Sequence, residues 1–85
     1  MNITLQDLSK GPVYLQVREQ IGAQISSKAV KSGEVLPSPA VLAQKLSVDK
    51  GEILRAYFEL EQLGLVNKES GTDFLGKPRT TYRVV

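Results

Sequence analysis

The stretch that decides the fold is residues 36–66, which read LPSPAVLAQKLSVDKGEILRAYFELEQLGLV. It contains two segments whose apolar residues recur at the helical spacing of three and four, joined by a very short connection. In the first segment, Ser38 followed by Pro39 is typical of a helix start, with serine as the N-cap and proline in the first turn. A short helix is therefore predicted over residues 38–46. Its expected inward residues are Val41, Leu42 and Leu46.

The second segment follows after only two connecting residues. Asp49 and Glu52 stand three residues apart, which is the spacing of a capping box with aspartate in place of the usual serine or threonine. Gly64 is well placed to end the helix, because glycine readily adopts the left-handed conformation found there. A longer helix is therefore predicted over residues 49–63. Its expected inward stripe consists of Ile53, Ala56, Tyr57, Leu60 and Leu63.

Toward the N-terminus, helical periodicity appears again. Pro12 stands where a first-turn proline is tolerated, and a first helix is predicted over residues 12–28. Its apolar stripe consists of Tyr14, Val17, Ile21 and Ile25. The first ten residues carry a weaker pattern, in which Ile3 and Leu5 alternate with polar residues and allow a short strand.

Toward the C-terminus, the pattern changes from helical periodicity to alternation. We predict a β-hairpin over residues 65–85, with its loop between Ser70 and Arg79. The complete order over residues 1–85 is helix, helix, short turn, helix and hairpin. This order predicts a single, mainly α domain with a small β-hairpin, the winged helix-turn-helix.

Composition narrows the function classes. The chain has 85 residues, of which 41% are hydrophobic, enough for one modest core. It has no cysteine and no histidine, so thiolate chemistry, the usual proton shuttle and the commonest metal ligand are missing. We therefore predict no enzyme activity, no metal and no cofactor. Because no apolar run could span a bilayer and no export signal is visible, a cytoplasmic location without membrane association is expected.

The charge distribution favours nucleic acid as the partner. The net charge is +2, and residues 76–85 carry Lys77, Arg79 and Arg83 without an acidic residue. In a winged helix-turn-helix, the outer residues of the last helix reach base edges in the major groove, and a basic hairpin can grip phosphates. This architecture and this charge together predict binding to double-stranded DNA.

Residues 12–72 resemble the DNA-binding domain of GntR-family regulators. The opening PVYLQVREQI is similar to the first helix of that family. The positions that fall on the family pattern are Leu36, Pro37, Ser38, Leu42, Ala43, Leu46, Val48, Arg55, Ala56, Tyr57, Leu60, Gly64 and Leu65. The resemblance implies a transcriptional regulator. The end of the hairpin, GKPRTTYRVV, is similar to the wings of PadR-like and MarR-like regulators.

The sequence also departs from the GntR pattern. Ala40 stands where the family usually carries an arginine, and DKGE at residues 49–52 replaces a Ser-Arg-x-Thr start of the last helix. Lys50 keeps the charge of the family's arginine but lacks the forked geometry that binds guanine. Asp49 and Glu52 are expected to face the phosphates and to weaken or change the base preference.

Seven residues are candidates for DNA contact. Lys50, Gly51 and Arg55 are expected on one side of the last helix, with a solvated face balanced by carboxylates as the alternative. The full set is Lys45, Lys50, Gly51, Arg55, Lys77, Arg79 and Thr80. For the hairpin residues the alternative is an ordinary charged loop tip, and for Lys45 a solvated side chain. Glu52 is expected to be a cap residue rather than a base reader.

Leu54 and Phe58 lie four residues apart, outside the inward stripe of the last helix. Either the hairpin or the N-terminal segment covers them, or they form a patch for self-association or protein binding. The leading hypothesis is a sequence-specific regulator that binds a two-fold DNA site as a homodimer, without an effector-binding domain. The alternative is a winged-helix protein-interaction module that has lost base reading, with Leu54 and Phe58 as its contact patch.

Overall fold

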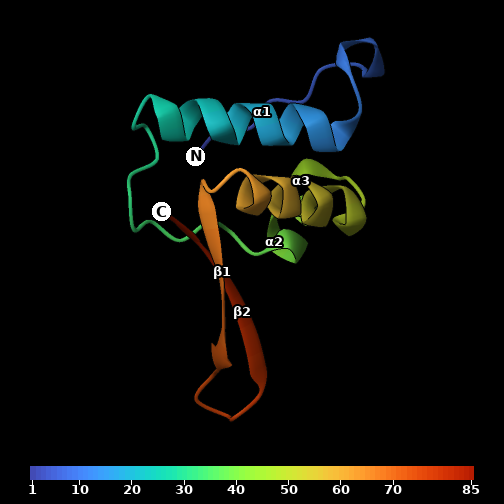
Figure 1. Cartoon of the computed structure of the whole chain (residues 1–85). Helices are drawn as coiled ribbons and strands as arrows, with labels where there is room; N and C mark the ends of the chain where they lie inside the picture. Colours follow the sequence, from blue (N-terminus) through green and yellow to red (C-terminus); the bar gives the residue numbers. More distant parts are fainter.

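The computed structural model describes residues 1–85. Its elements are a 3-10 turn, η1 (Leu8–Lys10), three helices, α1 (Val13–Ser26), α2 (Pro39–Leu46) and α3 (Lys50–Gln62), and two strands, β1 (Val66–Thr72) and β2 (Pro78–Val84). Figure 1 shows α1 lying along α3, α2 on the other side of α3, and the hairpin projecting away from the helices. The predicted fold class, a mainly α winged helix-turn-helix with a small hairpin, is confirmed. No helix has the length and apolar character needed to cross a membrane.

The local signals position the helix starts. The Ser38 hydroxyl accepts a hydrogen bond from the Val41 N–H at 3.2 Å, and the Asp49 carboxylate accepts one from the Gly51 N–H at 2.9 Å. Both satisfy amides that have no partner inside their helix. Ser47, between α2 and α3, adopts the left-handed conformation with φ at 57° and so closes the short turn.

The core lies between the three helices and the base of the hairpin. Its largest fully buried side chains are Val17, Ile21, Val30, Ile53, Tyr57, Leu60 and Val66. Two expected inward residues are exposed instead: Val41, at 57%, and Leu63, at 63%. Val41 lies about 100° around α2 from Leu42, which packs into the core.

The C-terminal end of α3 explains the exposure of Leu63. Gly64 has a φ of 77°, its N–H donates to the carbonyl of Glu61, and the Leu65 N–H donates to the carbonyl of Leu60, both at 3.0 Å. This pair of bonds is a Schellman motif, which turns the chain sharply after the helix. As a result Leu65, rather than Leu63, packs against the core.

The possible strand at Ile3 and Leu5 is not formed. The backbone there is extended, but glutamine side chains of α1 make the hydrogen bonds that a partner strand would make. Three glutamines along α1 bind the extended backbone: Gln20 exchanges two bonds with Thr4, at 2.8 and 2.7 Å. Gln16 bonds in the same way to Gln6, and Gln24 donates to the Asn2 carbonyl at 2.6 Å. Four residues of helix rise by about 6 Å and two residues of strand by about 6.6 Å, so the two spacings match.

The two strands of the hairpin pair antiparallel with a register that sets Lys68 opposite Tyr82 and Ser70 opposite Thr80. A five-residue loop, 73–77, joins them, and Gly76 takes a φ of 80° there. At its base, β2 is also bonded to the segment before α2, since the Leu36 N–H donates to the Tyr82 carbonyl at 2.8 Å. The hairpin is therefore fixed to the helices at its base and free at its tip.

Candidate nucleic-acid interface

Tyr57 fixes the position of α3 relative to the hairpin and to α2. It is completely buried, and its hydroxyl donates to the Pro37 carbonyl at 2.7 Å, just before α2 begins. Its ring meets that of Tyr82 edge-on, with the centroids 4.9 Å apart. One side chain thus contacts the start of α2 and strand β2. This leaves the opposite side of α3 exposed beside the hairpin.

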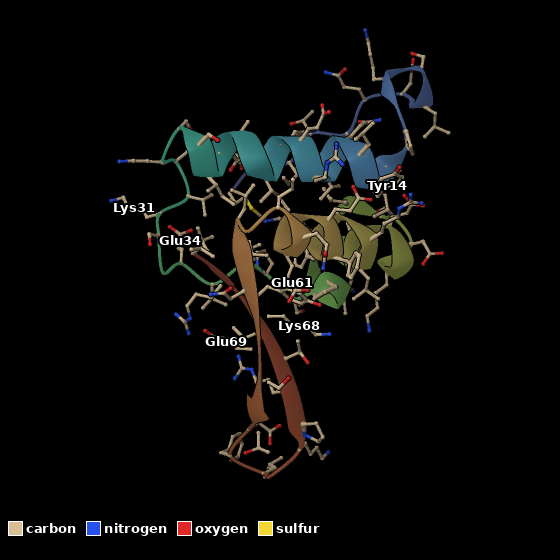
Figure 2. The ribbon with its side chains drawn as sticks, in the orientation of Figure 1. Tyr14, Lys31, Glu34, Glu61, Lys68 and Glu69 are labelled. Atoms are coloured by element: carbon tan, nitrogen blue, oxygen red, sulfur yellow. The ribbon has the colours of Figure 1, made fainter.

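A groove of about 220 Å³ lies where the exposed side of α3 meets the hairpin. We call it the α3–wing groove, and its lining residues are Pro39, Lys50, Leu54, Lys68, Thr80 and Tyr82. It brings together two of the predicted DNA contacts, Lys50 from the first turn of α3 and Thr80 from β2. Sequence reasoning missed Lys68, which joins them from β1 (Figure 2). The signal that would have identified it is the strand register, since Lys68, Ser70 and Thr80 lie on one face of the hairpin.

The cations of this region have no internal partner. No carboxylate oxygen lies within 4.0 Å of the charged groups of Lys45, Lys50, Lys68, Lys77 or Arg79, whereas Arg18, Arg55 and Arg83 all form ion pairs. Of these cations, Lys50 and Lys68 line the same groove, and cations that lie close together without partners attract a polyanion through their positive potential. Lys45, near the end of α2, is exposed but does not line the groove.

Arg55 is directed differently from Lys50, contrary to the expectation that the two share one side of α3. A step of five residues turns about 140° around a helix. The Arg55 guanidinium lies over the Tyr14 ring of α1, 3.8 Å from its centroid, and its Nε is 3.3 Å from Glu59. Its side chain is still 60% exposed. Arg55 therefore bridges α3 to α1 and has only its outer edge free for a ligand.

Glu59 is a junction between α1 and α3. It binds Arg18 of α1 as well as Arg55 of its own helix. The hydrogen bond from Arg18, reinforced by Arg55, lowers the pKa of Glu59 below its usual range. Because the pKa is lowered, the ion pairs of Glu59 stabilise the folded chain fully at pH values above the ordinary carboxyl pKa. This stabilisation is lost as the pH falls from the ordinary pKa through the lowered one.

Glu52 does not face the phosphate side, and the capping box is incomplete. The Glu52 carboxylate is half-buried and accepts a hydrogen bond from the Tyr14 N–H of α1 at 2.9 Å. Pro12, the N-cap residue of α1, makes no side-chain cap bond. Glu52 thus supplies from α3 the cap that α1 lacks, and a carboxylate is favourable at the positive end of a helix. Of the two acids expected to repel DNA, only Asp49 stays on the outer surface.

Replacing Glu52 by alanine is expected to lower the free energy of unfolding by about 1–2 kcal/mol, because the Tyr14 N–H loses its cap. Glu52→Gln keeps an acceptor oxygen and is expected to lose less. Urea denaturation measures both, and Glu19→Ala, at an exposed position of α1, is the control. If Glu52 repelled DNA instead, both variants would bind duplex more tightly than the original chain.

The hairpin separates two residues that were predicted as one group. Thr80 pairs with Ser70 and faces the α3–wing groove, whereas its neighbour Arg79 pairs with Gly71 on the other face. There Arg79, Glu69 and Thr81 line a second hollow of about 250 Å³. Figure 2 shows Lys68 and Glu69 on opposite sides of β1. The hairpin therefore presents cations on both faces.

The tip of the hairpin is shaped by Asp73. Its carboxylate accepts hydrogen bonds from the N–H groups of Leu75, at 2.8 Å, and Lys77, at 3.0 Å. These bonds use the only acidic group of the loop to hold the turn. Lys77 then leaves the tip unpaired, next to two exposed apolar side chains, Phe74 and Leu75.

The outer side of α3 is apolar over much of its length. Leu54 is 41% and Phe58 57% exposed, so neither is fully covered as one interpretation expected, although Leu54 lines the groove beside the hairpin. Gly51, one turn before Leu54, is also exposed. A Cβ atom on Gly51 would approach only Asp49 of its surroundings, no closer than 3.5 Å, so the packing of the fold does not require glycine there.

The comparisons with known proteins agree with this geometry. The family described as bacterial regulatory proteins, gntR family, matches residues 13–74. The uncharacterized HTH-type transcriptional regulator YhcF of Bacillus subtilis (strain 168) is 36% identical over 63 residues, which are 74% of this chain and 52% of YhcF. This chain thus spans about half the length of that curated relative.

A solved structure extends the likeness to almost the whole chain. YtrA from Sulfolobus acidocaldarius, a GntR-family transcription factor, superimposes with a TM-score of 0.79 and 31% sequence identity. The superposition covers 98% of this chain and 80% of YtrA, so it includes the hairpin as well as the helices. The family match over residues 13–74, with these two relatives, shows that the chain belongs to the gntR family of bacterial regulatory proteins.

Proposed function

We propose that this chain binds double-stranded DNA through the exposed side of α3 and the hairpin beside it, and regulates transcription by doing so. The observation that carries the proposal is the α3–wing groove. It gathers Lys50, Lys68 and Thr80 from three elements onto one exposed surface, and neither lysine has an internal ion pair. Family membership supports the same role.

In the proposed complex, the first turns of α3 enter the major groove and the hairpin follows the backbone. Lys50 and Gly51 approach the bases, while Lys68 and Thr80 contact the adjacent phosphates. Lys77 and Arg79, farther out on the hairpin, bind phosphates or the neighbouring minor groove. Lys45 and the outer edge of Arg55 add backbone contacts. In this arrangement α3 determines which base sequence is preferred, and the outer hairpin adds affinity that is the same for every DNA sequence.

We further propose that two copies bind a two-fold site, with half-sites about one helical turn, roughly 34 Å, apart. One α3 helix and one hairpin offer few base contacts, and a second copy doubles them. A protected region about twice as long as one domain can cover, with two-fold symmetry, would support this arrangement in a footprinting experiment.

The proposal is tested by titrating a fluorescently labelled random-sequence duplex at several salt concentrations. Each phosphate contact contributes a slope of about −0.9 to the plot of log affinity against log salt. We expect a steep negative slope for the original chain, and a slope reduced by about one contact for Lys68→Ala. Lys31→Ala removes the same charge from the loop after α1, far from the groove in Figure 2, and is expected to change neither affinity nor slope. If no duplex binds even at low salt, the proposed DNA binding is wrong.

A further inference from the structure

The outer side of α3 offers few free groups that recognise bases by hydrogen bonds. Its exposed residues are Lys50, Gly51, Leu54, Arg55, Phe58 and Gln62. Arg55 is stacked on Tyr14 and paired with Glu59, and the Asp49 carboxylate before them caps the helix. In the first two turns, the free hydrogen-bonding groups are the Lys50 ammonium and the outer edge of the Arg55 guanidinium, whose Nε alone is bonded. Between them and Gln62, which is exposed at the end of the helix, this surface consists of Gly51, Leu54 and Phe58.

Gly51, Leu54 and Phe58 form one continuous stripe. Spacings of three and four residues place them in line along one side of a helix. From Gly51 to Phe58 the helix rises by about 10 Å, which corresponds to roughly three base pairs at 3.4 Å each. Because Gly51 has no side chain, the start of the stripe allows the helix backbone to come close to a ligand.

The surroundings of the stripe indicate what covers it. Leu54 lines the α3–wing groove between Lys50, Lys68 and Thr80, so unpaired cations and a hydroxyl surround an aliphatic side chain. Such a surface fits a polyanion that also presents apolar groups. In the major groove of DNA, the thymine C5-methyl is the apolar group at the base edges, and apolar side chains recognise it by contact.

We propose that Leu54 and Phe58 recognise thymine methyl groups in the major groove, while Lys50 and Lys68 hold the phosphates beside them. This inference rests on the proposed DNA binding and specifies its chemistry: the preferred sites contain thymines about two base pairs apart, the distance between Leu54 and Phe58 along the helix. It also assigns to DNA two residues that otherwise look like a protein-binding patch.

Deoxyuridine provides the test, since it differs from thymidine only by the missing methyl group. Duplexes that bind the original chain are first enriched from a random 20-base-pair pool. The enriched pool is then copied once with thymidine and once with deoxyuridine in both strands. We expect the deoxyuridine copy to bind about fourfold more weakly for each recognised methyl group that it lacks, with an unchanged salt slope because the phosphates are the same.

The double variant Leu54→Ala, Phe58→Ala links this difference to the two side chains. It is expected to bind both copies with equal affinity and to keep the salt slope of the original chain. Leu8→Ala, which removes an exposed leucine from η1, is the matched control and should still prefer the thymidine copy. Because Leu54 and Phe58 are exposed, the variant should keep its thermal unfolding transition, which circular dichroism checks.

Three results would overturn the inference. If the original chain binds both copies equally and with a steep salt slope, methyl recognition is wrong but DNA binding stands. If the double variant still discriminates between the copies, other residues sense the methyl groups. If neither copy binds at low salt, DNA binding itself fails, and the inference fails with it.

Discussion

Replacing Tyr57 by alanine should lower the free energy of unfolding by about 3–5 kcal/mol, because it leaves a large cavity in the core. Domains of this size are stable by only about 5–15 kcal/mol, so the substitution would remove a large share of the stability. It eliminates the packing against Tyr82 and the hydrogen bond to Pro37. Both fix α3 against the hairpin, so duplex affinity should fall as well. Urea denaturation and duplex titration measure the two effects.

Tyr57→Phe separates the ring from the hydroxyl. It keeps the packing and removes only the bond to the Pro37 carbonyl, so we expect a loss of about 0.5–1.5 kcal/mol. Phe58→Ala, at the exposed neighbouring position, should leave stability almost unchanged. A loss for Tyr57→Ala no greater than that for Phe58→Ala would contradict the role of Tyr57 in the core.

The hydroxyl of Tyr57 also predicts how stability depends on pH. Burial raises the pKa of this phenol well above its usual range, with Tyr82 contributing. In the unfolded chain the phenol loses its proton near pH 10, whereas in the folded chain the phenol is still protonated at that pH. The contribution of this group to the free energy of unfolding is therefore fully present below pH 10. It falls as the pH rises above 10, because there the folded state binds more protons than the unfolded state. Tyr57→Phe should show less of this alkaline loss.

Replacing Lys50 by alanine should weaken binding to the preferred duplex by about 1–3 kcal/mol, a loss of roughly 5- to 150-fold. Lys50 is the single free cation on the exposed side of α3 that lines the α3–wing groove, and it has no internal partner whose loss would complicate the result. Because α3 is proposed to face the bases, the loss should be smaller for random sequence, so that preference relaxes.

Arg79→Ala is the matched comparison. Arg79 lies on the opposite face of the hairpin from the α3–wing groove and is proposed to contact phosphate. The Arg79→Ala variant should bind preferred and random duplexes more weakly to the same extent, and its salt slope should be smaller by about one phosphate contact. Equal and negligible effects of Lys50→Ala and Arg79→Ala would contradict DNA binding by this surface.

The elements of the fold were predictable because their signals are local. Ser38 and Pro39 mark the start of α2, and the spacing around Tyr57 marks the inner side of α3, without knowledge of any distant residue. The exposure of Leu63 was not predictable from periodicity, since the turn at Gly64 brings Leu65 into its place. Local pattern thus identifies an element better than it identifies the residues at its ends.

The candidate site was only partly predictable, because its geometry depends on pairs that are distant in sequence. Glu52 caps a helix that begins 39 residues earlier, and Arg55 stacks on a ring of that same helix. Lys68 joins the groove, and Arg79 leaves it, because of the strand register. Charge and residue type thus identify candidate DNA contacts. The direction of each side chain depends on the neighbouring element against which it packs.

The glutamine side chains along α1 form the hydrogen bonds to the N-terminal backbone that a neighbouring β-strand would otherwise form. Gln16, Gln20 and Gln24 occupy one side of the extended N-terminal backbone. On the other side, Ile3 and Leu5 make no backbone hydrogen bond. An open strand edge is a template for pairing with another chain, but its strength grows with its length. Here only Ile3 and Leu5 leave their backbone groups free along this edge, so it offers few hydrogen bonds to a strand of a neighbouring molecule.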